Sequence, residues 1–130
     1  EDEFRRIEKE TLKSIIDKTE SSDVDEASKA GRMVLALGGG AVIREECEEM
    51  VHSGTLCIYL RASLETLVAH LESEASDRPL LSGTSLRERI SELMALRSST
   101  YENTAHVIID TDSRSIESIA QEIRRIYMSL

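Results

Sequence analysis

Three consecutive glycines, Gly38 to Gly40, follow directly on an apolar run in the stretch "VLALGGGAV". Because glycine has no Cβ atom, such a loop lets a bound molecule approach the backbone N–H groups. A helix expected from about Arg44 would add its positive N-terminal end. The triplet therefore indicates a binding loop for an anion or a polyol. It can equally be a tight turn between a strand and a helix, and its spacing alone leaves both interpretations open.

Two arginines occupy positions that favour an anionic partner. Arg97 follows Met94 by three residues and Leu93 by four, which places its guanidinium in line with the apolar side of a helix. Arg78 precedes the only proline of the chain in an irregular loop, where a planar cation suits a phosphate clamp. Each also has a simpler interpretation. Arg97 could extend its charged end to solvent along the apolar surface or close a helix C-terminus, and Arg78 could be solvated.

A further arginine, Arg5, lies in a helix predicted for about residues 2–18 from the spacing of its apolar residues. Glu8 follows it at i+3, so the two can form an ion pair on the helix surface. Such a pair contributes only about 0.3 kcal/mol and explains nothing further by itself.

The elements that position these residues follow from the alternation of short apolar runs with amphipathic stretches. Continuous apolar runs of this length are typical of strands buried on both faces, and periods of three to four residues are typical of helices. Strands are predicted at 33–37, 55–60 and 106–111, and helices at 2–18 and 44–52 and after the capping residues Ser63, Ser85 and Ser115.

This alternation predicts one α/β domain over residues 1–130, with a parallel sheet covered by helices on both faces. The stretch at about 73–85 lacks periodicity and contains the proline, so it is predicted to be a loop.

Composition excludes several classes of function. The formal net charge of −9 and the absence of a Lys/Arg run argue against a nucleic-acid partner. No apolar stretch approaches the roughly 18 residues of a membrane span, and the acidic start is unlike a signal peptide. Two cysteines without a CxxC spacing favour a reducing compartment, without a disulfide framework or structural zinc. A cytoplasmic protein is expected.

Taken in order, six segments resemble the successive signature segments of shikimate kinases. They are "FRRIEKETL", "VLALGGGAV", "IYLRASLETL", "RPLL", "LRSSTY" and "VIIDTDSRS". Each segment has little specificity by itself, but six in one order with family-like spacing cover nearly the whole chain.

The resemblance implies a P-loop, nucleoside-monophosphate-kinase-like α/β fold with strand order 2-3-1-4-5, of which strands 3, 4 and 5 fall in this chain. It implies transfer of the ATP γ-phosphate to the 3-hydroxyl of shikimate by a cytoplasmic, monomeric enzyme of aromatic amino acid biosynthesis. The residues matching the family's sites are, for shikimate, Arg5, Glu8, Gly38, Gly39, Gly40 and Arg97; for catalysis on a mobile lid over about 73–85, Arg78; and for the nucleotide, Arg78 and Arg114.

Three features depart from the family pattern. The phosphate-binding GxxxxGK[ST] loop is absent, together with its Mg²⁺-holding hydroxyl, and so is the acidic pair that follows the family's second strand. His70 occupies a nucleotide-facing position that is usually arginine. The P-loop and the Mg²⁺ ligands are therefore expected in a segment before Glu1. Without the central strand of that segment, this chain alone is expected to be inactive and poorly stable.

Two alternatives to a shikimate kinase remain open at this point. One is a kinase-derived domain that binds a small carboxylated ligand or a protein partner without catalysis. The other is a related small-polyol kinase such as gluconate kinase, although the glycine triplet together with "RPLL" favours shikimate.

Overall fold

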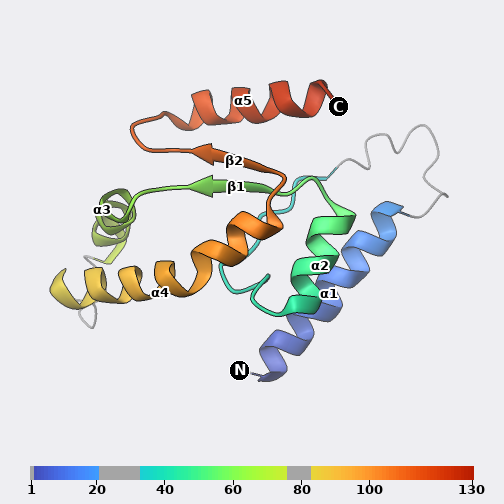
Figure 1. The fold of residues 1–130 in the computed structure, drawn as a ribbon, viewed down its shortest axis with the longest axis horizontal. Helices are drawn as coiled ribbons and strands as arrows, with labels where there is room; N and C mark the ends of the chain where they lie inside the picture. The colour runs from blue at the N-terminus through green and yellow to red at the C-terminus, as the bar shows by residue number, and fades with distance from the viewer. Residues whose placement is uncertain (1, 21–32, 76–82) are drawn as a thin grey trace. The chain divides into compact units, whose positions relative to one another are not determined.

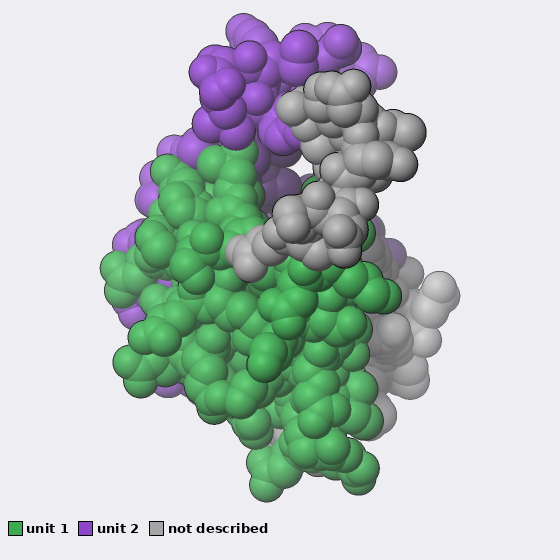
Figure 2. Space-filling view, turned by 90° about the vertical axis from the view of Figure 1, so that its right-hand side faces the viewer, with its two compact units in different colours: residues 1–57, 103–106 green, residues 58–102, 107–130 purple. Residues whose placement is uncertain are grey.

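A computed structural model describes residues 2–20, 33–75 and 83–130 of the chain (Figure 1). Its residues form two compact units, 1–57 with 103–106 and 58–102 with 107–130, which Figure 2 shows in two colours. Each unit is described by itself.

The first unit is built on two helices, α1 (Asp2–Glu20) and α2 (Glu45–Gly54). Both were predicted, and each extends two residues beyond the predicted C-terminal end. Their apolar sides supply most of the buried side chains of this unit: Leu12, Ile16, Ala41, Val42, Cys47 and Val51. Burial of such aliphatic groups, at about 25 cal/mol per Å² of apolar surface, is what holds the two helices together.

Residues 103–106 contact the rest of the first unit through two histidines, His52 of α2 and His106 of the segment itself. Nδ1 of His52 lies 2.9 Å from the carbonyl oxygen of Thr104, and the rings of His52 and His106 stack at 4.3 Å between centroids. The backbone N–H of Cys57 donates to Nδ1 of His106 at 2.9 Å. These contacts anchor the end of a helix and the start of a strand.

The second unit contains a parallel pair of strands, β1 (Ile58–Arg61) and β2 (Val107–Asp110). Their register pairs Ile58 with Val107 and Arg61 with Asp110, so the carboxyl ends of both strands meet at one edge. Three helices complete the unit, α3 (Leu64–Ala75), α4 (Gly83–Thr104, whose last residues lie in the first unit) and α5 (Ile116–Met128).

Helices α3 and α4 pack as their sequence periods predict, whereas α5, which was expected to bury a continuous apolar stripe, has no buried residue and leaves Ile116 86% exposed. Val68 of α3 and Leu86 and Ile90 of α4 form a buried cluster, and Leu64, Leu67 and Met94 pack around it. Ser115 caps α5, since its hydroxyl accepts a hydrogen bond from the N–H of Ser118 at 3.1 Å. In Figure 1, α5 runs back along β2. The α/β class with a parallel sheet is thus confirmed.

One predicted strand is not formed. Residues 33–37 have no regular secondary structure, and Val34 is 98% exposed instead of buried on both faces. A strand is stabilised by hydrogen bonds to a neighbouring strand, and the sheet of the described residues contains only β1 and β2. The run therefore has the apolar composition of a buried strand, but no strand in the described part of the chain pairs with it.

The predicted loop at 73–85 is shorter than expected at both ends. Helix α3 continues to Ala75 and α4 begins at Gly83, two residues before the predicted cap Ser85. The remaining residues, 76–82, lie outside the described part of the chain.

Candidate functional site

Arg5 and Glu8 form the centre of the candidate site in the first unit. They are one turn apart on α1, and Nη1 of Arg5 donates to Oε1 of Glu8 at 2.8 Å. Their side chains are 24% and 23% exposed, far less than the 58% of neighbouring Arg6, whose partners are Glu3 and Glu10. The guanidinium of Arg5 also lies over the ring of Phe4, 5.4 Å from its centroid. Arg5 is therefore held in one orientation, whereas Arg6 is a surface residue.

The glycine triplet lies against this ion pair. A Cβ atom placed on Gly40 would lie 2.6 Å from Cζ of Arg5, closer than any side chain allows, and one on Gly38 would lie 3.8 Å from Oε2 of Glu8. Gly39 lies between them and is exposed. The structure thus brings Arg5, Glu8 and the triplet together, as the resemblance implied.

The tight-turn interpretation of the triplet explains only part of its composition. The chain does turn here, with the N–H of Ala41 donating to the carbonyl oxygen of Gly38 at 3.0 Å. None of the three glycines has a positive φ, so the backbone conformation does not require glycine. At Gly40 the requirement is space for the guanidinium of Arg5.

The N-terminus of α2 contributes less to an anion site than its position suggests. Glu45, Glu46 and Glu48 occupy its first turn, where their carboxylates meet the positive end of the helix. Glu46 forms an ion pair with Lys9, which lowers the pKa of Glu46. The positive end of α2 is therefore already balanced by carboxylates of its own first turn.

Arg97 lies in the second unit, on α4. Its side chain is half-buried, and it makes no hydrogen bond or ion pair within the described residues. A half-buried cation without an anionic partner in this part of the chain is compatible with a residue that binds an anionic ligand, and that role stays a prediction. The alternative of closing the helix is not what this geometry shows, since α4 continues seven residues further, to Thr104.

Arg114 precedes α5 and folds onto that helix. Its Nη1 donates to Oε1 of Glu122 at 3.0 Å, and its Nη2 donates to Oγ of Ser118 at 2.9 Å. The preceding residue, Ser113, has a φ of 58°, the left-handed conformation that turns the chain from β2 into α5. In this arrangement Arg114 stabilises the start of α5.

The sequence also singled out two further residues, His70 and Arg78. His70 is exposed on α3. Arg78, the predicted lid arginine, lies outside the described residues.

Sequence reasoning missed a group of polar residues at the carboxyl ends of β1 and β2. Arg61 binds Asp110 through two hydrogen bonds, Nε to Oδ1 at 2.6 Å and Nη2 to Oδ2 at 3.1 Å. Asp112 accepts from the N–H of Ser63 at 3.0 Å. A hollow of about 300 Å³ lies here, lined by Tyr59, Arg61, Ala62, Ser63, Met94, Ser98, Glu102, Asp110 and Asp112. The signal available in the sequence was the place of Arg61 at the end of an apolar strand, where ligands of α/β sheets bind.

These contacts shift several pKa values. The hydrogen bond from Arg61 lowers the pKa of Asp110, and the backbone N–H of Ser63 lowers that of Asp112. Burial raises the pKa of Tyr59, against the smaller opposing effect of a hydrogen bond with the side chain of Ser98. At neutral pH the aspartates are therefore charged and the tyrosine is a neutral phenol.

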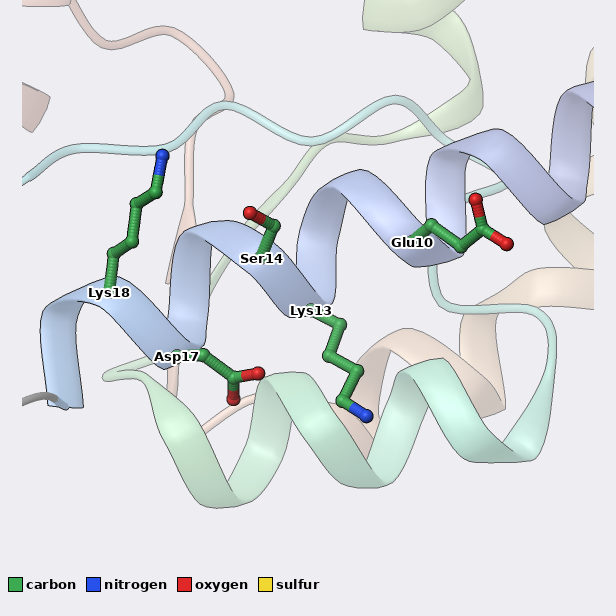
Figure 3. Close-up of a pocket in the computed structure, with 5 residues that line it drawn as sticks. All are labelled: Glu10, Lys13, Ser14, Asp17 and Lys18. Atoms are coloured by element: carbon green, nitrogen blue, oxygen red, sulfur yellow. The ribbon is translucent and has the colours of Figure 1, made fainter.

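A second hollow, of about 450 Å³, is open along α1 and lined by Glu10, Lys13, Ser14, Asp17 and Lys18 (Figure 3). In Figure 3 Lys18 points to the side of the helix opposite Lys13 and Asp17. Because these charges do not converge on one point, the hollow has no geometry for a specific ligand.

Two kinds of feature are absent from the described residues. No group of three or more His, Cys, Asp or Glu side chains is placed to hold a metal ion. No helix in the part of the chain that the structure describes is long and apolar enough to cross a membrane.

Comparisons with known proteins identify a family for the chain. The family model for shikimate kinase matches residues 1–127. The shikimate kinase of Thioalkalivibrio sulfidiphilus is 36% identical over 108 residues, which are 83% of this chain and 56% of that protein. Those of Marinomonas sp. and Dictyoglomus turgidum are each 34% identical over 95% of this chain, covering 62% and 65% of their own lengths.

The chain thus spans about six-tenths of the length of these curated relatives. No solved structure matches it. The family model covers nearly every residue, including the arginines and glycines described above, and on that basis the chain belongs to the shikimate kinase family.

Proposed function

We propose that this chain is the substrate-binding part of a shikimate kinase, which transfers the γ-phosphate of ATP to the 3-hydroxyl of shikimate. The 3-hydroxyl oxygen forms a bond to the γ-phosphorus, the bond to the β,γ-bridging oxygen breaks, ADP leaves and the hydroxyl proton passes to solvent. Such a transfer depends on positioning and on neutralising charge on the phosphoryl oxygens, with little covalent chemistry from the protein.

The single observation that carries the proposal is the packing of Gly40 against the guanidinium of Arg5, which Glu8 holds in place. Nη1 of Arg5 is engaged by Glu8, and its Nε and Nη2 have no partner among the described residues. A guanidinium with a free edge and a fixed orientation suits bidentate binding of a carboxylate, the anionic group of shikimate. The glycines beside it leave room for the ring hydroxyls to reach the backbone.

The other predicted residues take roles in the same reaction. Arg97 is proposed to bind the carboxylate of shikimate, as the family resemblance implies, and its half-buried position without an anionic partner in the described part of the chain supports this role. Arg78 is proposed to approach the transferring phosphate from the lid. Arg114 is proposed near the nucleotide, and because Ser118 and Glu122 already hold it, its role there is to fix the loop after β2.

Magnesium is expected with ATP in this reaction. The described residues contain no group of carboxylate or histidine ligands that fits the ion, so none of them is assigned to it and no step is drawn through it. We also infer that the protein is a monomer. We infer a cytoplasmic location, in line with two free cysteines, which a reducing compartment preserves.

The proposal is tested on the full-length protein by following ADP release with ATP and shikimate, and by locating the new phosphate on the product by NMR. ADP release is expected to depend on shikimate, and the product is expected to carry phosphate on the 3-oxygen. An analogue lacking the 3-hydroxyl is the matched control and should give no turnover. Turnover of gluconate instead of shikimate, or shikimate binding without ADP release, would contradict the proposal.

A further inference from the structure

Tyr59 and Arg61 project from the same side of β1 and contact α4 four and five residues after Arg97. The rings of Tyr59 and Tyr101 lie 5.3 Å apart between centroids, tilted at 56°. Tyr59 and Ser98, the residue after Arg97, line the same hollow. On the same strand, Nη1 of Arg61 lies 3.6 Å from Oε1 of Glu102. All of these residues belong to the second unit.

These contacts restrict how α4 can turn about its own axis. Residues three and four apart share one face of a helix, so Met94 and Tyr101 lie on the same face as Arg97, and Ser98 and Glu102 lie on the adjacent face. Contacts at Tyr101 and Glu102 restrict the rotation of this helix and with it the directions open to the Arg97 side chain.

Arg61 is itself held at the end of the sheet. Its two hydrogen bonds to Asp110 on β2 form a fork, and its carbonyl oxygen accepts from the N–H of Thr111 at 2.9 Å. Its side chain is 41% exposed and those of Asp110 and Glu102 are 68% and 47% exposed. Exposed ion pairs contribute little to stability, so the network has more value for orientation than for folding.

We propose that Arg61 is a positioning residue for Arg97: it links both strands to α4 through Asp110 and Glu102 and so restricts the orientation of the Arg97 guanidinium, which binds the substrate carboxylate. This rests on the proposed function, in which Arg97 binds that carboxylate. Arg61 makes no contact with the substrate in this scheme and acts only through α4.

A different effect of Arg61 has to be separated from positioning. Arg61 neutralises two carboxylates, and its loss alone would make the surroundings more negative and repel an anionic ligand. Glu102→Ala distinguishes the two, because it removes a negative charge and breaks the link to α4 at the same time. Positioning predicts weaker shikimate binding in this variant, whereas neutralisation predicts tighter binding.

The test is calorimetric or NMR titration of the full-length protein with shikimate and with its methyl ester, which lacks the carboxylate charge. Arg61→Gln and Glu102→Ala are each expected to weaken shikimate binding about three- to tenfold and to leave ester binding unchanged. In an Arg97→Ala background, itself weakened about tenfold to a hundredfold, neither change should weaken binding further. Thermal unfolding identifies any variant that has failed to fold.

Arg87→Gln is the matched control. Arg87 of α4 forms an ion pair with Glu65 of α3 that is equally exposed, but it lies ten residues from Arg97, so shikimate affinity should not change. Unchanged affinity in Arg61→Gln, an equal loss for the ester, or additivity with Arg97→Ala would overturn the positioning role. If Arg97→Ala alone leaves shikimate affinity unchanged, the proposed role of Arg97 fails and the positioning role fails with it.

Discussion

Nη1 of Arg5 lies 2.8 Å from Oε1 of Glu8, and the backbone of Gly40 lies against the same guanidinium. An ion pair at i, i+3 on a helix surface contributes little to stability. Here the two side chains are only about a quarter exposed, and the pairing leaves Nε and Nη2 of Arg5 without a partner among the described residues. The pair is thus better suited to orient a cation for a ligand than to stabilise α1.

Replacing Gly40 by alanine is expected to weaken shikimate binding about tenfold without unfolding the protein. The new Cβ would meet the Arg5 guanidinium, which is the flexible end of a side chain and can move away. Its displacement costs part of a charged hydrogen bond, which contributes about 1.5–3 kcal/mol. Gly38→Ala is the comparison and is expected to weaken binding less, because its Cβ would make only an ordinary 3.8 Å contact with Glu8. Equal affinities of the two variants, measured by calorimetry, would show that Gly40 has no such role.

Arg78→Ala is expected to lower kcat about a hundredfold with little change in the KM for shikimate. A lid cation directed at the moving phosphoryl group acts more in the transition state than in the ground state. Steady-state kinetics of the full-length protein measures both constants, with exposed Arg124→Ala as the control. A normal kcat with a raised KM would instead place Arg78 in substrate binding.

The pKa of Asp110 is expected to rise toward its ordinary value of about 3.9 when Arg61 is replaced by glutamine. The hydrogen bond from Arg61 lowers that pKa in the folded protein. Because the folded value is the lower one, the stabilisation is present above the ordinary value and is lost as the pH falls through the folded value. NMR titration of the side-chain carboxyl measures the change.

Asp112 provides an internal control in the same titration. Its pKa is lowered mainly by the backbone N–H of Ser63, which Arg61→Gln does not remove. A change of the same size at both aspartates would mean that the loop has rearranged and that the Arg61 hydrogen bond is not the cause.

Ser115→Ala is expected to lower the free energy of unfolding by about 1 kcal/mol, because it removes the hydroxyl that accepts from the N–H of Ser118 at the start of α5. Urea denaturation measures the loss. Ser53→Ala is the matched control: its hydroxyl bonds only the carbonyl oxygen of Glu49 one turn back within α2, and its removal should be nearly neutral. A neutral Ser115→Ala would show that the cap contributes little.

The sequence predicted the elements whose signals are local. Ser115 was identified as a cap from its place before an apolar period, and β2 from a short apolar run, and both are present. The run at 33–37 has the same composition as a buried strand but forms none, because a strand depends on a partner that no local pattern specifies.

The same distinction between local signals and contacts of distant segments applies to the candidate site. Arg5 and Glu8 are three residues apart, so their pairing could be predicted from helix geometry, and the resemblance supplied the glycines beside them. Arg61 and Asp110 are 49 residues apart. Their contact follows from the register of two parallel strands, and no motif in either segment pointed to it.

The central claim is that Arg5, held by Glu8 beside the glycines, binds the substrate carboxylate. Calorimetric titration of shikimate into full-length Arg5→Ala and Arg6→Ala tests it most directly, because the two arginines are adjacent and only Arg5 lies against the glycine loop. The account predicts that Arg5→Ala weakens shikimate binding by about 1.5–3 kcal/mol and leaves ATP binding nearly unchanged, while Arg6→Ala behaves as the parent protein. Equal shikimate affinities of Arg5→Ala and Arg6→Ala would contradict it.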